Sequence, residues 1–167
     1  MIYQSQFLAE HHDSGEFDCK VTDLNRWLAN EAWRAQRADT ARTNVWTEPE
    51  SDKIRAYYSI TPTMVARADL SGGQASGYTS AIPGYLLAKL ALDQTLHGQG
   101  LGGELLFDAI SRIIGASEAY GGRLIVVDAI DDNAAAFYSR FGFVPVKQTE
   151  DRLVMKISSA RAALKAL

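Results

Sequence analysis

Four glycines gather in a six-residue stretch of this chain, between an apolar segment and an amphipathic one. They are Gly98, Gly100, Gly102 and Gly103. The leucines and isoleucines that follow recur at helical spacing as far as Ile114. Because glycine has no Cβ, such a cluster lets backbone N–H groups at a helix N-terminus approach an anion. The stretch therefore predicts a loop that binds an anion and opens a helix.

Hydrophobic periodicity predicts strands and helices along the rest of the chain. The expected strands cover residues 2–8, 41–49, 53–68, 85–93, 123–130, 144–148 and 152–157. The expected helices cover residues 21–37, 101–114, 131–142 and 158–167. The turn-forming residues of 69–85 predict a long loop. This order indicates an α/β fold, with a single domain over residues 1–167 and a mixed central β-sheet flanked by helices.

Individual residues predict where some of these elements begin or end. Thr22 or Asp23 is available to cap the first helix, and Ser158 to cap the last. Pro62 is expected to end or bend the third strand, because proline has no N–H to give to a sheet.

Composition and charge exclude several classes of protein. The chain has 167 residues, 47% hydrophobic and 22% charged, which suits one globular domain. The net charge of −3 argues against a surface that binds polyanions everywhere. The lone Cys19 can form no intrachain disulfide. There is no signal-peptide pattern, membrane-length apolar run or metal-ligand spacing, so we expect a cytoplasmic protein with no metal and no membrane contact.

Two interpretations of the glycines need no particular family. Gly98, Gly100 and Gly103 match the G-x-G-x-x-G pattern of dinucleotide-binding folds, with Asp128 as the ribose-binding acid. However, residues 94–97 separate the strand from Gly98, whereas that fold turns directly at the strand end. The alternative is that the glycines only turn the chain, although four are more than a turn needs, since each costs backbone entropy.

A third interpretation comes from resemblance. The segment His97-Gly98-Gln99-Gly100-Leu101-Gly102 resembles the (Gln/Arg)-x-x-Gly-x-(Gly/Ala) signature of the GCN5-related N-acetyltransferases, the GNAT family. The resemblance implies that these residues and Gly103 bind the pyrophosphate of acetyl-coenzyme A. The physics agrees, because successive N–H groups and a helix dipole both favour an anion. His97 takes the place of Gln or Arg, and its charge depends on pH.

A second motif supports the same family. The segment "FYSRFGF", residues 137–143, resembles the family's Tyr-x-x-x-Gly-Phe ending. It implies that Tyr138 is the general acid that protonates the thiolate leaving group. It also implies that Phe137 and either Asp131 or Asn133 lie at the cofactor, and the choice between those two stays open. A tyrosine packed in the core is the alternative for Tyr138.

The same resemblance assigns a role to backbone groups of the fourth strand. The backbone of Leu90, Ala91 and Leu92 is expected to bind the pantetheine arm as an added strand does. The N–H near Leu92 is expected to polarise the thioester carbonyl. The leucine side chains themselves are expected to pack in the core.

A narrower resemblance covers the N-terminal half. The segment "EFDCKVTDLNRWLANEAWRAQRADTARTNVW" is similar to the start of the acetyltransferase toxins of bacterial toxin–antitoxin modules. This implies acetylation of the α-amino group of aminoacyl-tRNA, a homodimer and a ribbon-helix-helix antitoxin partner. Arg34, Arg37 and Arg42 are the expected tRNA contacts, since arginine suits phosphate geometry. A solvated amphipathic helix is the alternative for this segment.

Three functions therefore stay open. The first is an aminoacyl-tRNA N-acetyltransferase toxin. The second is an acetyltransferase for a small amine, a peptide or a protein N-terminus, and the third is a non-catalytic domain that binds the cofactor. The segment "AYYSITP", residues 56–62, holds no glutamate that could act as a strong base. That favours an acceptor amine of low pKa, as an α-amino group is.

Overall fold

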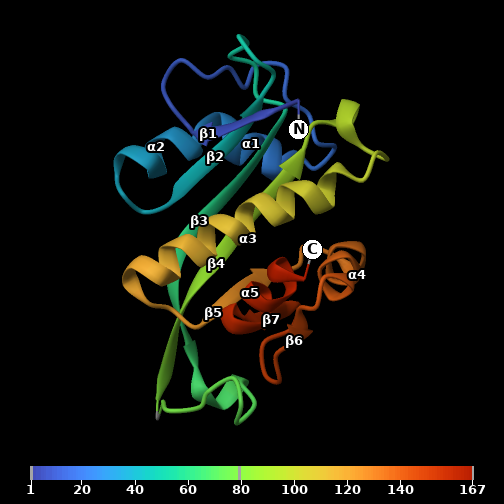
Figure 1. Cartoon of the computed structure of the whole chain (residues 1–167). Coiled ribbons are helices and arrows are strands. Elements are labelled where there is room, and N and C mark those ends of the chain that lie inside the picture. The colour runs from blue at the N-terminus through green and yellow to red at the C-terminus, as the bar shows by residue number, and fades with distance from the viewer. Residues whose placement is uncertain (1, 79, 167) are drawn as a thin grey trace. The chain divides into compact units, whose positions relative to one another are not determined.

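The chain, described by a computed structural model over residues 2–78 and 80–166, forms a mixed β-sheet with α-helices (Figure 1). The strands are β1 (Gln4–Phe7), β2 (Arg42–Thr47), β3 (Ala56–Ala66), β4 (Ala81–Leu92), β5 (Leu124–Asp128), β6 (Val144–Pro145) and β7 (Arg152–Lys156). The α-helices are α1 (Thr22–Asn30), α2 (Ala32–Arg37), α3 (Leu101–Tyr120), α4 (Asp132–Arg140) and α5 (Ile157–Lys165). Two short 3-10 helices, η1 (Arg67–Asp69) and η2 (Gln94–Leu96), complete the described elements.

The sheet has the order β1-β2-β3-β4-β5-β7-β6. Strand β4 runs parallel to β5, whereas β1–β2, β2–β3, β5–β7 and β6–β7 are antiparallel. The predicted α/β class with a mixed sheet is therefore confirmed. The contacts divide the chain into two compact units, residues 1–61 with 88–109 and residues 62–87 with 110–167. The interpretation of residues 1–167 as one domain stays a prediction.

The first unit has its core between the two N-terminal helices and the strands. Leu28 of α1 and Ala32 of α2 belong to one buried cluster with Val45 of β2 and Tyr57 of β3. Cys19 is buried in the same cluster, and burial raises the pKa of its thiol. The lone cysteine therefore packs as a small hydrophobic residue.

The single helix expected over residues 21–37 is two helices, which corrects the prediction. At Glu31 φ is −118°, far from the value of about −63° in a regular α-helix, while ψ stays helical at −30°. The Glu31 N–H still donates to the Trp27 carbonyl, and the Glu31 carbonyl accepts from Ala35. Because the helical hydrogen-bond spacing continues through the break, the apolar periodicity does not reveal it. Neither Thr22 nor Asp23 caps α1, whose N-cap is Val21 without a side-chain hydrogen bond.

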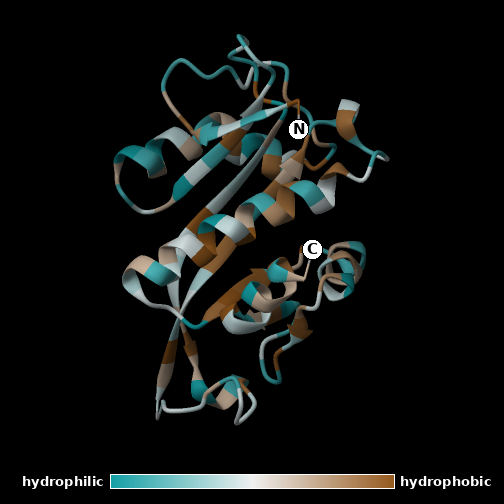
Figure 2. Ribbon diagram, in the orientation of Figure 1, coloured by the Kyte–Doolittle hydropathy of each residue, from teal (hydrophilic) through white to brown (hydrophobic). Residues whose placement is uncertain are grey.

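The second unit is built around β5. Its residues Leu124 to Val127 are fully buried, as expected for a strand covered on both faces, and Figure 2 shows β5 as a hydrophobic run. Leu124 and Val126 share a core cluster with Val154 of β7 and Ile82 of β4. The β4–β5 register runs from Gly84↔Leu124 to Leu87↔Val127.

Several boundaries in the second unit differ from the prediction. Of the two effects expected at Pro62, it does not end β3, which continues to Ala66, and a bend there stays a prediction. It lies beyond Ile60, the last β3 residue in the β2 register, so its missing N–H costs no bond there. Strand β4 already begins at Ala81, and this shortens the expected loop. No side chain caps α5, and Ser158 lies inside that helix instead of before it.

Candidate active site

A buried aspartate, Asp93, precedes the glycine loop, residues 97–103, and fixes its start. Asp93 caps η2, and its Oδ2 accepts hydrogen bonds from the Thr95 N–H at 3.0 Å and the Thr95 hydroxyl at 2.6 Å. Its Oδ1 accepts from the Asp18 N–H at 2.9 Å. Burial alone raises the pKa of the Asp93 carboxyl, but these hydrogen bonds outweigh burial and hold the pKa below its usual value. The ionised carboxylate therefore ties η2 to residue 18.

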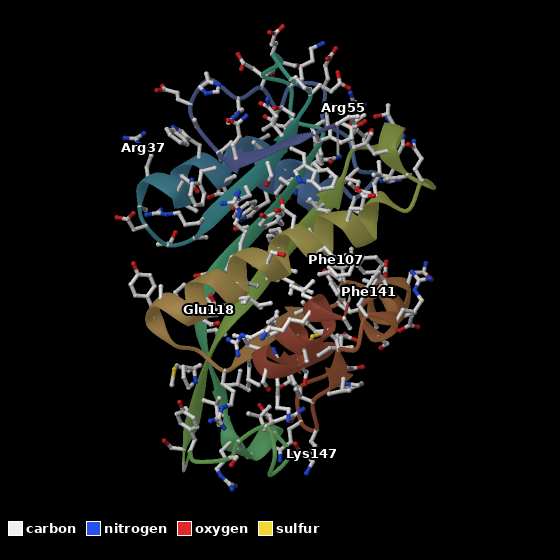
Figure 3. All side chains as sticks on the ribbon, viewed as in Figure 1. Arg37, Arg55, Phe107, Glu118, Phe141 and Lys147 are labelled. Carbon is white, nitrogen blue, oxygen red and sulfur yellow. The ribbon has the colours of Figure 1, made fainter. Side chains whose placement is uncertain are left out.

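A second anchor reaches the same turn from the segment before β3. The Arg55 guanidinium donates to Glu48 at 2.7 Å and to the Thr95 hydroxyl at 2.5 Å, and Figure 3 labels its side chain. The Arg55 carbonyl accepts from the Asp93 N–H at 2.8 Å. Sequence analysis missed this network, although the spacing of Asp93 and Thr95 is that of a capped turn. Asp93 and Arg55 thus both hydrogen-bond to Thr95 and fix the turn that leads into the glycine loop.

His97 makes a hydrogen bond within the chain. Its Nε2 lies 2.9 Å from the carbonyl oxygen of Leu92, the last residue of β4. A carbonyl only accepts, so Nε2 carries a proton in this arrangement. Nδ1 then donates only when the ring is charged. The neutral ring is therefore hydrogen-bonded to the end of β4, and the contact with the cofactor expected of His97 stays a prediction.

The four glycines serve two different purposes. Gly98 and Gly100 both have φ of +75°, in the left-handed region that favours glycine. A Cβ built on either would meet no protein atom within 4 Å, so conformation and not lack of space requires glycine there. Gly102 and Gly103 lie in the first turn of α3. The loop thus turns twice and then presents a helix N-terminus, which suits an anion.

A carboxylate on α3 is held by three strands. Oδ2 of Asp108 accepts from the Ser5 hydroxyl of β1 at 2.5 Å, the Trp46 indole of β2 at 3.1 Å and the Tyr58 hydroxyl of β3 at 3.1 Å. Sequence analysis did not single out Asp108, because its donors lie far away along the chain. These bonds fix the orientation of the first half of α3, and with it the glycine loop that precedes the helix.

The second motif surrounds α4. Asp131 caps this helix, because its Oδ1 accepts from the Ala134 N–H at 2.8 Å. Asn133 is exposed in the first turn. Of the two residues left open for the cofactor, Asp131 therefore has a role within the helix itself. The cofactor contact predicted for Asn133 stays a prediction.

Tyr138 is buried on α4 among aromatic rings. Its ring centroid lies 5.3 Å from that of Phe137 and 5.6 Å from that of Phe143, and only 8% of the residue is exposed. Burial raises the pKa of Tyr138 to about 12, so the hydroxyl keeps its proton at neutral pH. A general acid needs that protonated state, and a core tyrosine has it too.

The three arginines expected at tRNA differ in their surroundings. Arg42 donates to Asp39 at 2.7 Å and to the Gln36 carbonyl at 2.9 Å, so it holds the turn between α2 and β2. Arg34 forms an ion pair with Glu31, with its Nη1 3.7 Å from the Glu31 Oε2. Arg37 forms no ion pair within residues 2–78 and 80–166, and Figure 3 shows its side chain pointing outward from α2. Arg34 and Arg37 are therefore the pair better placed to meet an outside ligand.

The described residues include neither a metal site nor a membrane-spanning helix. No group of three or more histidine, cysteine or acidic residues there is arranged to hold a metal ion. None of the helices described is both long and apolar enough to cross a membrane.

Sequence comparison identifies relatives of this chain. A family model described as "Acetyltransferase (GNAT) domain" matches residues 28–155. A curated "tRNA-acetylating toxin" of Mycobacterium tuberculosis is 35% identical over 112 residues, which are 67% of this chain and 68% of the relative. A "Probable toxin TacT" of Sinorhizobium fredii is 26% identical over 163 residues, with 92% of this chain and 90% of the relative covered.

Solved structures extend the similarity to the fold. "AtaT complexed with acetyl-methionyl-tRNAfMet" has a TM-score of 0.90 and 26% identity, covering 97% of this chain and 99% of that one. A point mutant of KacT has a TM-score of 0.91 at 24% identity and covers 98% and 99% of the two chains, so it shows the shared fold. A mutant AtaT bound to the C-terminus of the antitoxin AtaR and to acetyl-CoA has a TM-score of 0.85 at 26% identity, covering 98% and 99%.

Proposed function

Because this chain belongs to the GNAT acetyltransferase family, we propose that it is a toxin that acetylates the α-amino group of aminoacyl-tRNA and so blocks translation. The observation that carries this proposal is the extent of the similarity to AtaT, a protein solved with acetyl-methionyl-tRNAfMet. That similarity includes the arginine-bearing helices α1 and α2 as well as the acetyltransferase motifs. The acetyl donor is acetyl-coenzyme A, with which an AtaT mutant has also been solved.

The glycine loop is the proposed pyrophosphate site. Positive φ at Gly98 and Gly100 turns the backbone so that successive amides can face one anion, and the N-terminus of α3 adds its dipole. The hydrogen bonds of Asp93 before the loop and of Asp108 after it hold the loop in one conformation. Binding of the cofactor therefore costs little conformational entropy. Gln99, Leu101, Gly102 and Gly103 complete the proposed contact with the cofactor.

The acyl transfer needs an oxyanion donor and a proton donor. The amine nitrogen bonds to the thioester carbonyl carbon, the carbon–sulfur bond breaks, and the amine releases a proton to solvent. We assign polarisation of the carbonyl to the backbone N–H at Leu92, with Leu90 and Ala91 binding the pantetheine arm. Tyr138, protonated at neutral pH, gives its proton to the departing thiolate and regains a proton from solvent.

The nature of the acceptor amine agrees with the absence of a strong base. An α-amino group has a pKa of about 7.7–8.0, and the neighbouring ester of aminoacyl-tRNA lowers it, so much of it is neutral at pH 7. The described segment Ala56–Pro62 of β3 contains no acidic residue. A lysine side chain, at about 10.4, would need more help.

The same relatives support the proposal of an antitoxin partner. We propose a cytoplasmic homodimer held inactive by an antitoxin of the ribbon-helix-helix type, since AtaT has been solved with the antitoxin AtaR. For the RNA, Arg34 and Arg37 are the proposed phosphate contacts and Arg42 supports them from the following turn.

Mass spectrometry of charged tRNA, incubated with the enzyme and acetyl-coenzyme A, tests the acceptor. We expect N-acetyl aminoacyl-tRNA, and the activity should fall steeply with salt because phosphate contacts release counterions. Arg34→Glu with Arg37→Glu should lower this activity and leave acetyl-coenzyme A binding intact. Lys147→Glu with Lys165→Glu gives the same change in net charge elsewhere and serves as the control. Acetylation of a polyamine or a peptide, with no charged tRNA modified, would refute the toxin assignment in favour of a small-amine enzyme.

A further inference from the structure

A cavity within the unit of residues 62–87 and 110–167 is lined by cations and not by acids. Its volume is about 440 Å³, within the range of small-ligand sites. Arg123 at the start of β5, Lys156 at the end of β7 and Arg161 of α5 all line it. In a chain with a net charge of −3, three cations around one cavity are a local exception.

The lining also offers neutral hydrogen-bond donors. Ser76 and Ser158 contribute hydroxyls, and Gly122 brings bare backbone to the wall. Helix α5 begins there without a side-chain cap at its N-cap residue, Lys156, and its first amide, that of Ile157, donates to the Arg123 carbonyl at 2.8 Å. An uncapped helix start leaves amides of its first turn without an acceptor inside the helix. Cations, hydroxyls and a helix N-terminus together favour an anion with several acceptor oxygens.

The two arginines are held in place, and of the two only Arg161 has an acidic partner, Glu118, which lies outside the lining of the cavity. The Arg123 guanidinium lies 4.8 Å from the centre of the Tyr78 ring and donates to the Ser76 carbonyl, which leaves its charge uncompensated by any acid of the lining. Arg161 has its Nε 3.6 Å from a Glu118 oxygen, too long for a hydrogen bond, and that Nε is buried without a hydrogen-bond partner among the described residues. Figure 3 labels Glu118 on α3.

We propose that this cavity binds a phosphate group, held by Arg123, Lys156 and Arg161 with the first turn of α5. The phosphate has two conceivable sources, free phosphate and the phosphodiester backbone of RNA. The site stands apart from the glycine loop in sequence and does not depend on the acetyltransferase assignment. Only the RNA source rests on the proposed function.

Amide NMR of the full-length ¹⁵N-labelled chain tests the site directly. Inorganic phosphate should shift the amide signals of Gly122 and Ser158, whereas Gly98 and Gly100 report separately on the glycine loop. A short RNA hairpin with an acceptor stem is the second probe. If the hairpin shifts Gly122 and Ser158 and phosphate competes with it, the phosphodiester is the source. Shifts with phosphate alone assign the site to a small ligand.

Variants decide whether the cations hold the ligand. Lys156→Gln and Arg161→Gln should each weaken phosphate binding about tenfold, since each removes a charged donor. Glu118→Gln should strengthen binding about threefold, because it removes the negative charge beside Arg161. Lys165→Gln on the same helix, outside the cavity, should change nothing.

Three results would overturn the proposal. They are the absence of shifts at Gly122 and Ser158 with either probe, equal affinity in wild type and Arg161→Gln, and weaker binding in Glu118→Gln. If acetyl-coenzyme A failed to shift Gly98 and Gly100 while phosphate still shifted Gly122, only the proposed function would fall.

Discussion

The glycine loop and the helix that bears Tyr138 are proposed to serve one reaction, yet they are held by opposite kinds of interaction. The loop is fixed by charged and polar groups, with Asp93, Thr95 and Arg55 at its entry. Tyr138 is fixed by the rings of Phe137 and Phe143. A loop that offers backbone amides needs its dihedral angles defined, and directional hydrogen bonds define them. A tyrosine hydroxyl carries its proton at neutral pH even at its ordinary pKa of about 10, so what apolar packing supplies is a fixed position of the ring.

The largest effect on catalysis should come from Tyr138, which is held by apolar packing. Tyr138→Phe removes one oxygen and keeps the ring packing, so kcat should fall by roughly 10²–10⁴ with the Kd for acetyl-coenzyme A nearly unchanged. Steady-state kinetics with calorimetry separate the two quantities. Phe143→Leu is the control, since it disturbs packing against Tyr138 without removing a proton donor. If Tyr138→Phe keeps wild-type kcat, or loses cofactor binding and thermal stability together, Tyr138 is a core residue only.

In the polar region the next effect should come from the left-handed backbone. Gly100→Val forces a β-branched residue to φ +75°, at a cost of about 1–3 kcal/mol, and should raise the Kd for acetyl-coenzyme A about tenfold. Gly100→Asn is the matched variant, because asparagine tolerates this region, and it should weaken binding far less. Calorimetry of both variants measures the difference. Equal losses would mean that space for the ligand, and not backbone conformation, is what Gly100 provides.

The carboxylate anchor should respond to pH. At pH 7, Asp93→Asn should lower the free energy of unfolding by about 1–3 kcal/mol, because buried donors lose a charged acceptor. The folded-state pKa of Asp93 lies below its usual 3.8, so its stabilisation is complete above that value and is lost as the pH falls through the lower folded one. Urea unfolding at pH 7 and pH 3 should therefore show a gap between wild type and variant that narrows in acid. A gap that stays constant would exclude the ionised form as the anchor.

The smallest effect should come from His97. His97→Gln keeps a side-chain donor for the Leu92 carbonyl and restores a residue of the family signature, so the change in cofactor binding should be about 0.5 kcal/mol. His97→Ala removes the bond and should weaken binding further. If both variants bind acetyl-coenzyme A as wild type does, the hydrogen bond between His97 and the Leu92 carbonyl does not contribute to cofactor binding.

The element order and the place of the glycine loop were readable without a structure. Apolar period and turn residues act locally, so strand β5, helix α3 and the glycines between β4 and α3 were expected where they lie. The sequence did not predict the break at Glu31, nor that α1 and α5 begin without a side-chain cap. Intrinsic propensity is weak, and tertiary packing decides such details.

What the sequence by itself determined is therefore the fold class and the family motifs, which lie in contiguous segments. Only the tertiary structure decided which polar groups meet across distant segments. Asp108 gained donors from three strands, and Arg123, Lys156 and Arg161 came to line one cavity. The physical reason is that a hydrogen bond or a charged cavity depends on distances of a few ångströms, which separation along the chain does not encode.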